Sequence, residues 1–154
     1  KMYPPLRSRD HVDAVIEAIK DGTITAFTTD HAPHIEPDKI KPFVDATYGT
    51  VGIETSFAVM NTYLVEAGHL SLSDGLALMT HKPAAIIRKP KGTLVVGADA
   101  DIAIIDLSKR WIVDPTKFYS KGRNSVFAGK ELTGKVVHTI VGGVVKMRNE
   151  GIVK

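Results

Sequence analysis

The sequence predicts an α/β fold that is followed by a β-rich segment, and two observations carry this prediction. Within residues 1–88, several segments place apolar residues at helical spacing, and a β-branched run lies between the first two of them. From residue 92 onward, short runs rich in Val and Ile are separated by turns that contain Gly. A helix that is followed closely by a buried-looking strand is the unit from which α/β proteins are built.

The first predicted elements are a helix over residues 8–20 and a strand over Thr23–Thr29. Ser8 is a favourable N-cap, and apolar residues at positions 12, 15, 16 and 19 form a single stripe along the helix. Gly22 is placed to end the helix. The strand that follows is rich in β-branched residues and carries little charge, so we expect it to be buried.

The later part of the chain contains three further predicted helices and a set of short strands. The last two strands are expected to form a hairpin, because the Gly142-Gly143 pair permits the primed two-residue turn. The predicted helices are Thr55–Ala67, a helix capped by Ser71 or Ser73, and Pro83–Ile87; the predicted strands are Ile102–Asp106, Trp111–Val113, Val136–Val141 and Val144–Met147.

Composition excludes several classes of protein. The chain has 154 residues, of which 44% are hydrophobic and 24% charged, and it has no cysteine. These values exclude a disordered chain, a disulfide scaffold and a thiolate zinc site. The formal net charge of +3 is spread without a dense basic cluster, so we expect no nucleic-acid partner. No apolar run reaches the ~20 residues of a membrane span and no signal peptide is visible, so we expect a cytoplasmic protein with no membrane partner.

Three residues with chemically useful side chains lie together where the predicted strand ends. Asp30, His31 and His34 fall within five positions. In α/β barrels this end of a strand carries the active site. A carboxylate can ligate a metal ion or act as a general base, and an imidazole can ligate a metal or carry a proton. By spacing alone, a turn cap with surface imidazoles explains the same residues, although the long loop from Ala32 to Gly52 favours function.

The segment Thr29-Asp30-His31-Ala32-Pro33-His34 closely resembles the last-strand motif of the dihydroorotases, which are amidohydrolases of pyrimidine biosynthesis. Other segments resemble the same family in the same order along nearly all 154 residues. These segments are Lys1-Met2 with Pro4-Pro5-Leu6-Arg7, Tyr48-Gly49-Thr50-Val51-Gly52-Ile53-Glu54-Thr55, Lys82-Pro83-Ala84, Gly97-Ala98-Asp99-Ala100-Asp101, and Ser120-Lys121-Gly122-Arg123-Asn124 with Phe127-Ala128-Gly129.

The resemblance implies a binuclear zinc hydrolase on a (β/α)₈ TIM-like barrel joined to a small β-sandwich domain. Residues 1–90 would be the C-terminal part of the barrel, and residues 91–154 would belong to the β-rich domain. The implied reaction is the reversible cyclisation of N-carbamoyl-L-aspartate to L-dihydroorotate. Two zinc ions are expected, with their other ligands outside this sequence, so this piece alone is expected to be inactive. A homodimer, or an assembly with aspartate transcarbamoylase, is the expected quaternary structure.

The resemblance also implies roles for individual residues. Asp30 would be a zinc ligand and the general base, and His34 would contact the carboxylate or ring of the substrate. The backbone at Tyr48 and Gly49 would line the pocket. Tyr3 stands where the bacterial motif has a substrate-contacting Asn, and a phenol cannot offer the paired donor and acceptor of a carboxamide. His31 is expected to have only a supporting role.

Three alternatives remain open from the sequence. The first is another cyclic-amide hydrolase, of the allantoinase or hydantoinase type. The second is a non-catalytic dihydroorotase-like scaffold beside aspartate transcarbamoylase, which the change at Tyr3 favours. The third is a β-rich binding module over residues 92–149, whose aromatic residues would form a ligand face unless they are core residues. Those aromatic residues are Trp111, Phe118, Tyr119 and Phe127.

Overall fold

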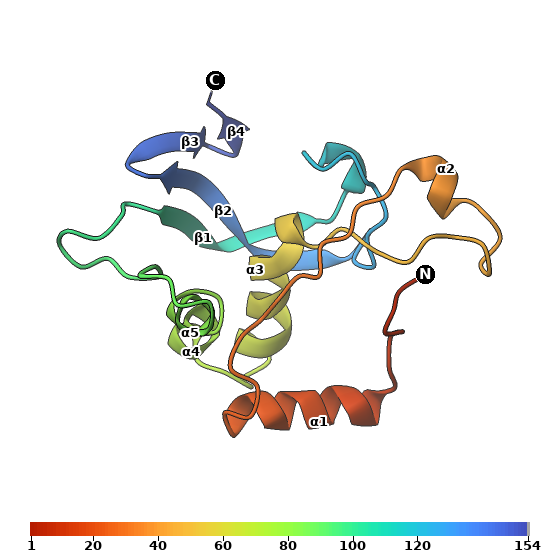
Figure 1. Cartoon of the computed structure of the whole chain (residues 1–154), viewed down its shortest axis with the longest axis horizontal. Coiled ribbons are helices and arrows are strands. Elements are labelled where there is room, and N and C mark those ends of the chain that lie inside the picture. The colour runs from red at the N-terminus through yellow and green to blue at the C-terminus, as the bar shows by residue number, and fades with distance from the viewer. Residues whose placement is uncertain (154) are drawn as a thin grey trace.

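The computed structural model describes residues 1–153, in which helices pack against one face of an antiparallel sheet (Figure 1). The described residues therefore form an α/β fold. No helix within this range is long and apolar enough to cross a membrane. The elements in chain order are α1 (Arg9–Lys20), α2 (Glu36–Lys39), the 3₁₀ helix η1 (Ile53–Thr55), α3 (Ser56–Met60), the π-helix η2 (Asn61–Val65), α4 (Leu72–Ala77), α5 (His81–Ile86), β1 (Ile102–Ile112), the 3₁₀ helix η3 (Pro115–Lys117), β2 (Glu131–Val141), β3 (Val144–Arg148) and β4 (Gly151–Ile152).

The sheet has four antiparallel strands in the order β1-β2-β3-β4. The predicted hairpin is confirmed, because Val141 of β2 pairs with Val144 of β3. Gly142 and Gly143, at the turn between them, have φ values of +55° and +78°. Positive φ at both central residues is the type I′ conformation, whose twist matches that of the two strands.

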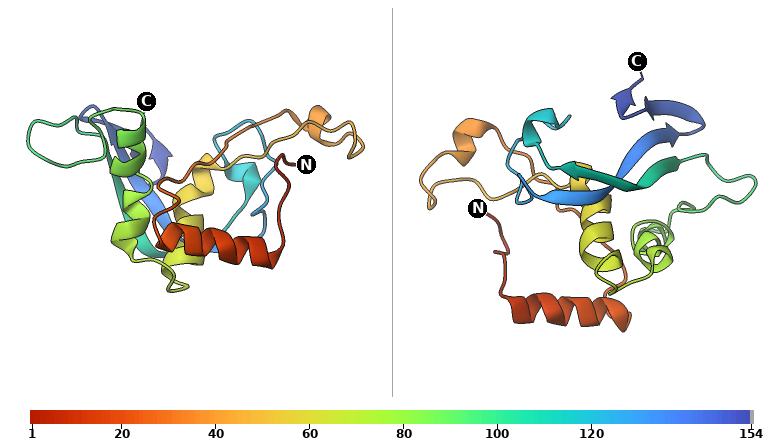
Figure 2. Two further views of the ribbon diagram at one scale, coloured as in Figure 1. Left: turned by 60° about the horizontal axis from the view of Figure 1, so that its bottom comes forward. Right: turned by 180° about the vertical axis from the view of Figure 1, so that it is seen from behind.

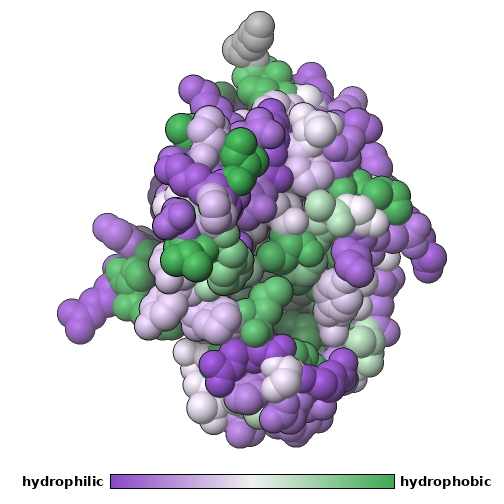
Figure 3. Space-filling view, turned by 90° about the vertical axis from the view of Figure 1, so that its right-hand side faces the viewer, coloured by the Kyte–Doolittle hydropathy of each residue, from purple (hydrophilic) through white to green (hydrophobic). Residues whose placement is uncertain are grey.

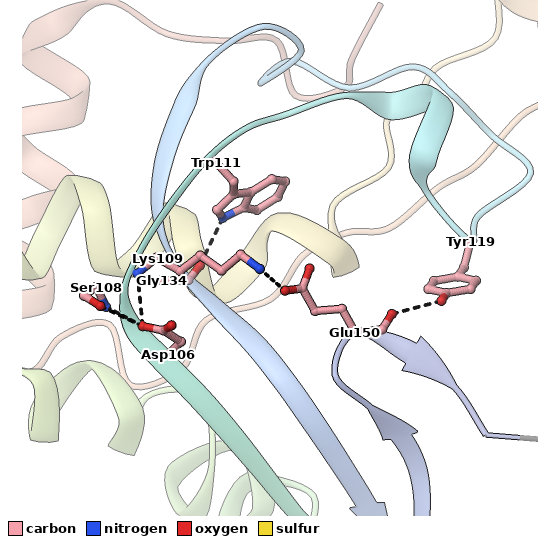
Figure 4. Close-up of polar contacts among 7 residues, drawn as sticks. All are labelled: Asp106, Ser108, Lys109, Trp111, Tyr119, Gly134 and Glu150. Carbon is pink, nitrogen blue, oxygen red and sulfur yellow. Dashed lines mark hydrogen bonds and ion pairs between the residues drawn. The ribbon is translucent and has the colours of Figure 1, made fainter.

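Two strands predicted separately in the region of residues 102–113 are one long strand, β1. Its register against β2 shifts between Asp106 and Arg110, where the intervening residues form a bulge. The Asp106 carboxylate accepts hydrogen bonds from the Ser108 N–H at 3.0 Å and from the Lys109 N–H at 3.1 Å (Figure 4). The carboxylate thus satisfies donors that the bulge removes from the ladder. The pKa of Asp106 is held below its usual value first by the hydrogen bond from the Ser108 hydroxyl, at 2.9 Å, and then by the Ser108 N–H.

The core lies between the sheet and the helix formed by α3. Leu132 lies in β2 and is 0% exposed. Val113 directly follows β1 and is 1% exposed. Trp111 and Phe127 are half-buried against the same cluster. Of the aromatic residues considered above as a ligand face, only Tyr119 is exposed, so this group serves mainly as core. The fully clustered core residues are Val51, Ala58, Val113, Phe118 and Leu132.

Gly134 is the position at which α3, β1 and β2 meet. Its φ is +93°, and a Cβ added there would lie 2.7 Å from a ring carbon of Phe57 on α3. Its carbonyl accepts a hydrogen bond from the Trp111 indole at 3.1 Å (Figure 4). Beside it, the Asn61 side chain donates to the Thr133 carbonyl at 3.1 Å. The Phe57 ring therefore packs directly on the backbone of β2 at Gly134. Figure 2 shows α3 beside the sheet in two further views.

Helix α1 agrees with its prediction at both ends, but only half of its apolar stripe is covered. Ile16 and Ile19 are buried, whereas Val12 and Val15 are 43% and 48% exposed. Figure 3 shows the molecule from the side of α2 and the N-terminus. Apolar residues gather there in the recess above α1, which lies at the bottom of the view.

The predicted strand over Thr23–Thr29 is wrong: this segment is not part of any strand. It is held by single hydrogen bonds, from the Ile24 N–H to the Ala18 carbonyl at 2.8 Å and from the Phe27 N–H to the Leu78 carbonyl at 2.9 Å. The physical reason is that a parallel strand needs a partner from a distant part of the chain, and no strand of residues 1–153 lies alongside this one.

The predicted helices after residue 55 exist with different bounds. The first is divided into η1, α3 and η2 rather than forming one continuous α-helix. Ser71 is the cap of α4, since its hydroxyl accepts from the Asp74 N–H at 3.1 Å. Helix α5 begins at His81, two residues before the predicted start, and carries Pro83 in its first turn.

Candidate active site

A surface hollow of about 450 Å³ brings together residues from three separate segments of the chain. Asp30 comes from the segment that follows α1, Tyr3 from the N-terminal segment, and Tyr48 with Gly49 from the far end of the long loop. Ala32 completes the lining. Four residues that sequence reasoning assigned to a site therefore surround one space.

The Asp30 side chain is exposed and free to act on a molecule in this hollow. Asp30 has a φ of +43°, a left-handed conformation that Asp adopts more readily than most residues. Within residues 1–153 its carboxylate has neither an ion-pair partner nor a hydrogen-bond partner. A carboxylate in this state can accept a proton or ligate a cation.

His31 supports the loop and does not line the hollow. Its Nδ1 accepts hydrogen bonds from the Gly52 N–H at 3.1 Å and, more weakly, from the Ile53 N–H at 3.4 Å. The adjacent Ala32 N–H donates to the Thr50 carbonyl at 2.9 Å, within the bridge between His31 and Thr50. These bonds hold the two ends of the long loop side by side.

His34 lies next to the hollow but outside its lining. Its ring is half-buried, and the ring carbon Cδ2 would be 3.0 Å from a Cβ placed on Gly49. The pKa of Asp38 is held below its usual value, first by a hydrogen bond from Lys41 and to a smaller extent by the charge of His34. The short distance between the His34 ring and Gly49 shows that the imidazole packs against the turn that Tyr48 and Gly49 form.

Gly49 is placed where a side chain cannot fit. Its φ is +134°, and an added Cβ would lie 2.6 Å from the carbonyl oxygen of Ala32 and 2.9 Å from the Ala32 Cβ. Contacts this short do not occur in real structures, so the close approach of the two sides of the hollow depends on glycine at this position.

Two aromatic rings stand at the hollow. Tyr3 and Tyr48 are in edge-to-face contact, with ring centroids 5.7 Å apart and planes inclined by 66°. The rings are largely accessible, since Tyr3 is 76% and Tyr48 52% exposed. Each ring offers an apolar face and a hydroxyl to a molecule in the hollow.

Two further residues hold the turn and were not among the predicted site residues. The Lys39 ammonium donates to backbone carbonyls of the turn, and the Asn124 amide donates to the Gly49 carbonyl at 3.2 Å. Asn124 belongs to a segment that the family resemblance had marked. Nothing in the sequence distinguishes Lys39 from its charged neighbours in the same loop.

The described residues do not form a complete metal centre. Among residues 1–153, no group of three or more His, Cys, Asp or Glu side chains is placed to hold one ion. A stable protein zinc site needs three or four ligands. Asp30 can therefore supply one ligand, and the others would have to come from outside these residues.

A second and larger cavity, of about 1020 Å³, lies between α3 and the sheet. The Lys135 ammonium in its wall lies 3.4 Å from the centre of the Trp111 ring. Burial lowers the pKa of Lys135. Across the same space Lys109 pairs with Glu150, whose carbonyl accepts from the Tyr119 hydroxyl at 3.1 Å (Figure 4). Three of the four aromatic residues considered in the sequence analysis as a ligand face line this cavity, namely Trp111, Phe118 and Tyr119.

Comparison with known proteins identifies one matching family and a set of relatives that share one name. The sequence profile of the amidohydrolase family matches residues 5–146. The dihydroorotase of Thermoanaerobacter sp. (strain X514) is 45% identical over 150 residues, which is 97% of this chain and 35% of the relative. The dihydroorotase of Pelotomaculum thermopropionicum is 48% identical over 152 residues, which is 99% of this chain and 36% of the relative. The chain thus spans about a third of the length of the curated relatives it matches.

Solved structures agree with the fold. The L-hydantoinase (dihydropyrimidinase) of Arthrobacter aurescens superposes with a TM-score of 0.92 at 36% identity, covering 100% of this chain and 35% of that one. The D-hydantoinase (dihydropyrimidinase) of Thermus sp. gives a TM-score of 0.90 at 27% identity, covering 99% and 34% of the two chains. The same arrangement of helices and strands therefore occurs within longer chains named as hydantoinases.

Proposed function

Because the chain belongs to the amidohydrolase family, we propose that it is part of a dihydroorotase, which interconverts N-carbamoyl-L-aspartate and L-dihydroorotate. The observation that carries the proposal is the hollow in which Asp30, Tyr48 and Gly49 meet. Relatives named dihydroorotase are 44% and 48% identical to this chain over 97% and 93% of its length, which supports this substrate over others.

Asp30 is the residue to which we assign the chemistry. Its unpaired carboxylate would take a proton from the attacking water and return it to the ring nitrogen when the amide bond breaks. General base catalysis of this kind contributes about 10²–10⁴-fold to a rate. Tyr48 and Gly49 would hold the flat ring beside Asp30, and His34 would reach the substrate carboxylate after a small movement of its ring.

Zinc is the metal that we propose for the longer protein. Zinc supplies an activated water and polarises the amide carbonyl. Asp30 fits the part of one ligand, because it is exposed at the hollow and has no competing partner within residues 1–153. Since these residues do not hold an ion by themselves, the proposal requires ligands from the remaining two thirds of the relatives' length.

The same proposal gives the chain a place in a larger fold. Residues 1–90 would belong to a (β/α)₈ barrel, and residues 91–154 to a small β-sandwich domain. The segment Thr23–Thr29, extended but without a strand partner, supports this because it would pair within a barrel. Exposed apolar residues such as Val96, which is fully exposed, and Phe43, which is 74% exposed, support a covering surface in the longer protein or its assembly.

The exposed apolar surfaces support an assembly, and we propose that the longer protein is cytoplasmic. We propose a homodimer, with aspartate transcarbamoylase as an alternative partner. Light scattering of the longer protein alone measures whether it is a homodimer. The same measurement on its mixture with that transferase detects a complex between the two. A monomer that does not bind the transferase would contradict this part of the proposal.

A hydantoinase is the second candidate, and the superposition on the Arthrobacter and Thermus structures favours it. The test is to express the longer protein with zinc and to compare the hydrolysis of L-dihydroorotate, hydantoin and allantoin. We expect kcat/KM for dihydroorotate to exceed the others by roughly 100-fold, which polar recognition of the carboxylate can supply. A preference for hydantoin would overturn the assignment, and no turnover of any of the three would favour a non-catalytic scaffold.

A further inference from the structure

Lys39, the last residue of α2, binds backbone carbonyls rather than a carboxylate. Its ammonium donates to the Thr47 carbonyl at 2.7 Å and to the Gly49 carbonyl at 2.8 Å, and a longer contact of 3.4 Å reaches the Lys1 carbonyl. The side chain is partly buried where it does so. One positive charge therefore joins the N-terminal segment to the glycine turn of the hollow.

These bonds hold the peptide group that precedes Tyr48 and the peptide group that follows Gly49. The Thr47 carbonyl precedes Tyr48 and the Gly49 carbonyl follows it, and Lys39 binds both. The Gly49 N–H is held in addition by the Lys1 carbonyl at 3.0 Å. Within residues 1–153 the N–H and carbonyl of Tyr48 itself have no hydrogen-bond partner. The turn is thus immobilised around a residue whose own polar backbone groups remain available.

The neighbouring Lys41 shows that this arrangement is specific to Lys39. Lys41 is exposed and forms an ordinary ion pair with Asp38 at 2.8 Å. Lys39 has no ion-pair partner among the described residues, and its charge is directed at carbonyl oxygens. Charge-assisted hydrogen bonds of this kind are about twice as strong as neutral ones, so several of them from one donor hold a turn firmly.

We propose that Lys39 is a positioning residue for the substrate. It holds the turn Thr47–Gly49 in the conformation in which Tyr48 and Gly49 form the wall of the hollow that also contains Asp30. It does not touch the reacting atoms and acts only through the turn. This inference rests on the proposed function, because it assigns the hollow to a substrate.

The kinetic test compares Lys39→Met, Lys39→Arg and the control Lys41→Met in the longer, zinc-loaded enzyme with L-dihydroorotate as the substrate. For Lys39→Met we expect KM to rise about tenfold or more while kcat falls less than about threefold, since a binding wall is lost and the base is kept. Lys39→Arg retains the charge and the donors. The rise in log KM for this variant should therefore be at most half of the rise for Lys39→Met. Lys41→Met should match the wild type.

Hydrogen exchange gives a second readout that needs no activity. In Lys39→Met the Gly49 amide should exchange at least about tenfold faster, whereas amides of β1 and β2 should exchange as in the wild type. An unchanged KM, or equal acceleration of exchange in the sheet, would overturn the positioning role. If the wild type does not hydrolyse dihydroorotate, the proposed function fails; exchange at Gly49 then still decides whether Lys39 holds the turn.

Discussion

The hairpin of β2 and β3 and the segment Thr23–Thr29 contain similar residues but behave differently. Both are rich in β-branched side chains, and both were predicted to be strands. The hairpin forms because its partner lies two residues away across Gly142-Gly143. The earlier segment stays extended without a ladder, since no strand of the described residues lies beside it.

The difference divides the molecule into a self-sufficient part and a dependent part. The sheet with α3 has a buried core and satisfies its own hydrogen bonds. The site region, from Asp30 to Gly49, pairs with no strand of the sheet; hydrogen bonds between loops and from the Lys39 ammonium hold it beside an open hollow. Substitutions in the sheet should therefore affect stability, and substitutions around the hollow should affect activity.

The largest expected effect is that of Asp30→Asn in the longer enzyme. Loss of the base should lower kcat by about 10²–10⁴-fold. In the metal-free protein, where the side chain is exposed and unpaired, the free energy of unfolding should change by less than about 0.5 kcal/mol. Initial rates of dihydroorotate hydrolysis and urea unfolding measure the two quantities. Activity within threefold of the wild type would remove the basis for the site.

Leu132→Ala should mainly lower the free energy of unfolding rather than the activity. Leu132 is fully buried, so its truncation should cost about 2–5 kcal/mol of unfolding free energy. Leu94→Ala is the matched control, because Leu94 is 78% exposed and its loss should cost less than about 0.5 kcal/mol. Equal midpoints of urea unfolding for the two variants would contradict the assignment of the core to this part of the molecule.

Gly49→Ala tests whether the hollow depends on close approach or only on backbone conformation. Gly22→Ala is the control: Gly22 has a φ of +83° and open space around it, so alanine there should cost only the left-handed strain of about 1–2 kcal/mol. Alanine at Gly49 adds the clash with Ala32 and should also raise KM. Indistinguishable unfolding and KM for the two variants would show that the loop adjusts freely.

The smallest expected effect concerns pH. The Lys91 ammonium bonds to Asp101 and to Asp99, which lowers the pKa of Asp101 and raises that of Lys91. The Asp101 contribution is present above the unfolded pKa and is lost as pH falls through the lower folded pKa. The Lys91 contribution is present below the unfolded pKa of the lysine while the carboxylates are ionised, and it is lost as pH rises through the raised folded pKa.

Lys91→Met should therefore be less stable than the wild type at neutral pH. The difference should shrink below about pH 4, as Asp101 is protonated. Urea midpoints of the two proteins at pH 7 and pH 3 test this. A difference that stays constant between the two values would show that the ion pair makes no contribution.

The sequence predicted what depends on near neighbours. Helix α1 and the hairpin follow from local spacing and from Gly142-Gly143, and both formed as expected. The bulge in β1 was missed, because Asp106 followed by Leu-Ser-Lys has the composition of a turn, and only the partner strand shows that the ladder resumes.

The site was predicted through its motif rather than through its spacing. Asp30, Tyr48 and Gly49 were named from the family resemblance, and the structure places all three at one hollow. Their roles remain predictions. Lys39 could not have been found, because its targets are carbonyl oxygens, which every residue has and no sequence pattern marks.

The contact of Phe57 with Gly134 restricts the order in which this protein can change during evolution. While the aromatic ring is present, any side chain at position 134 meets both a forbidden backbone conformation and an occupied space. Once position 57 carries a smaller residue, only the backbone penalty remains. A lineage that loses the ring first and the glycine second meets only the backbone penalty, whereas the reverse order passes through an intermediate that bears both penalties.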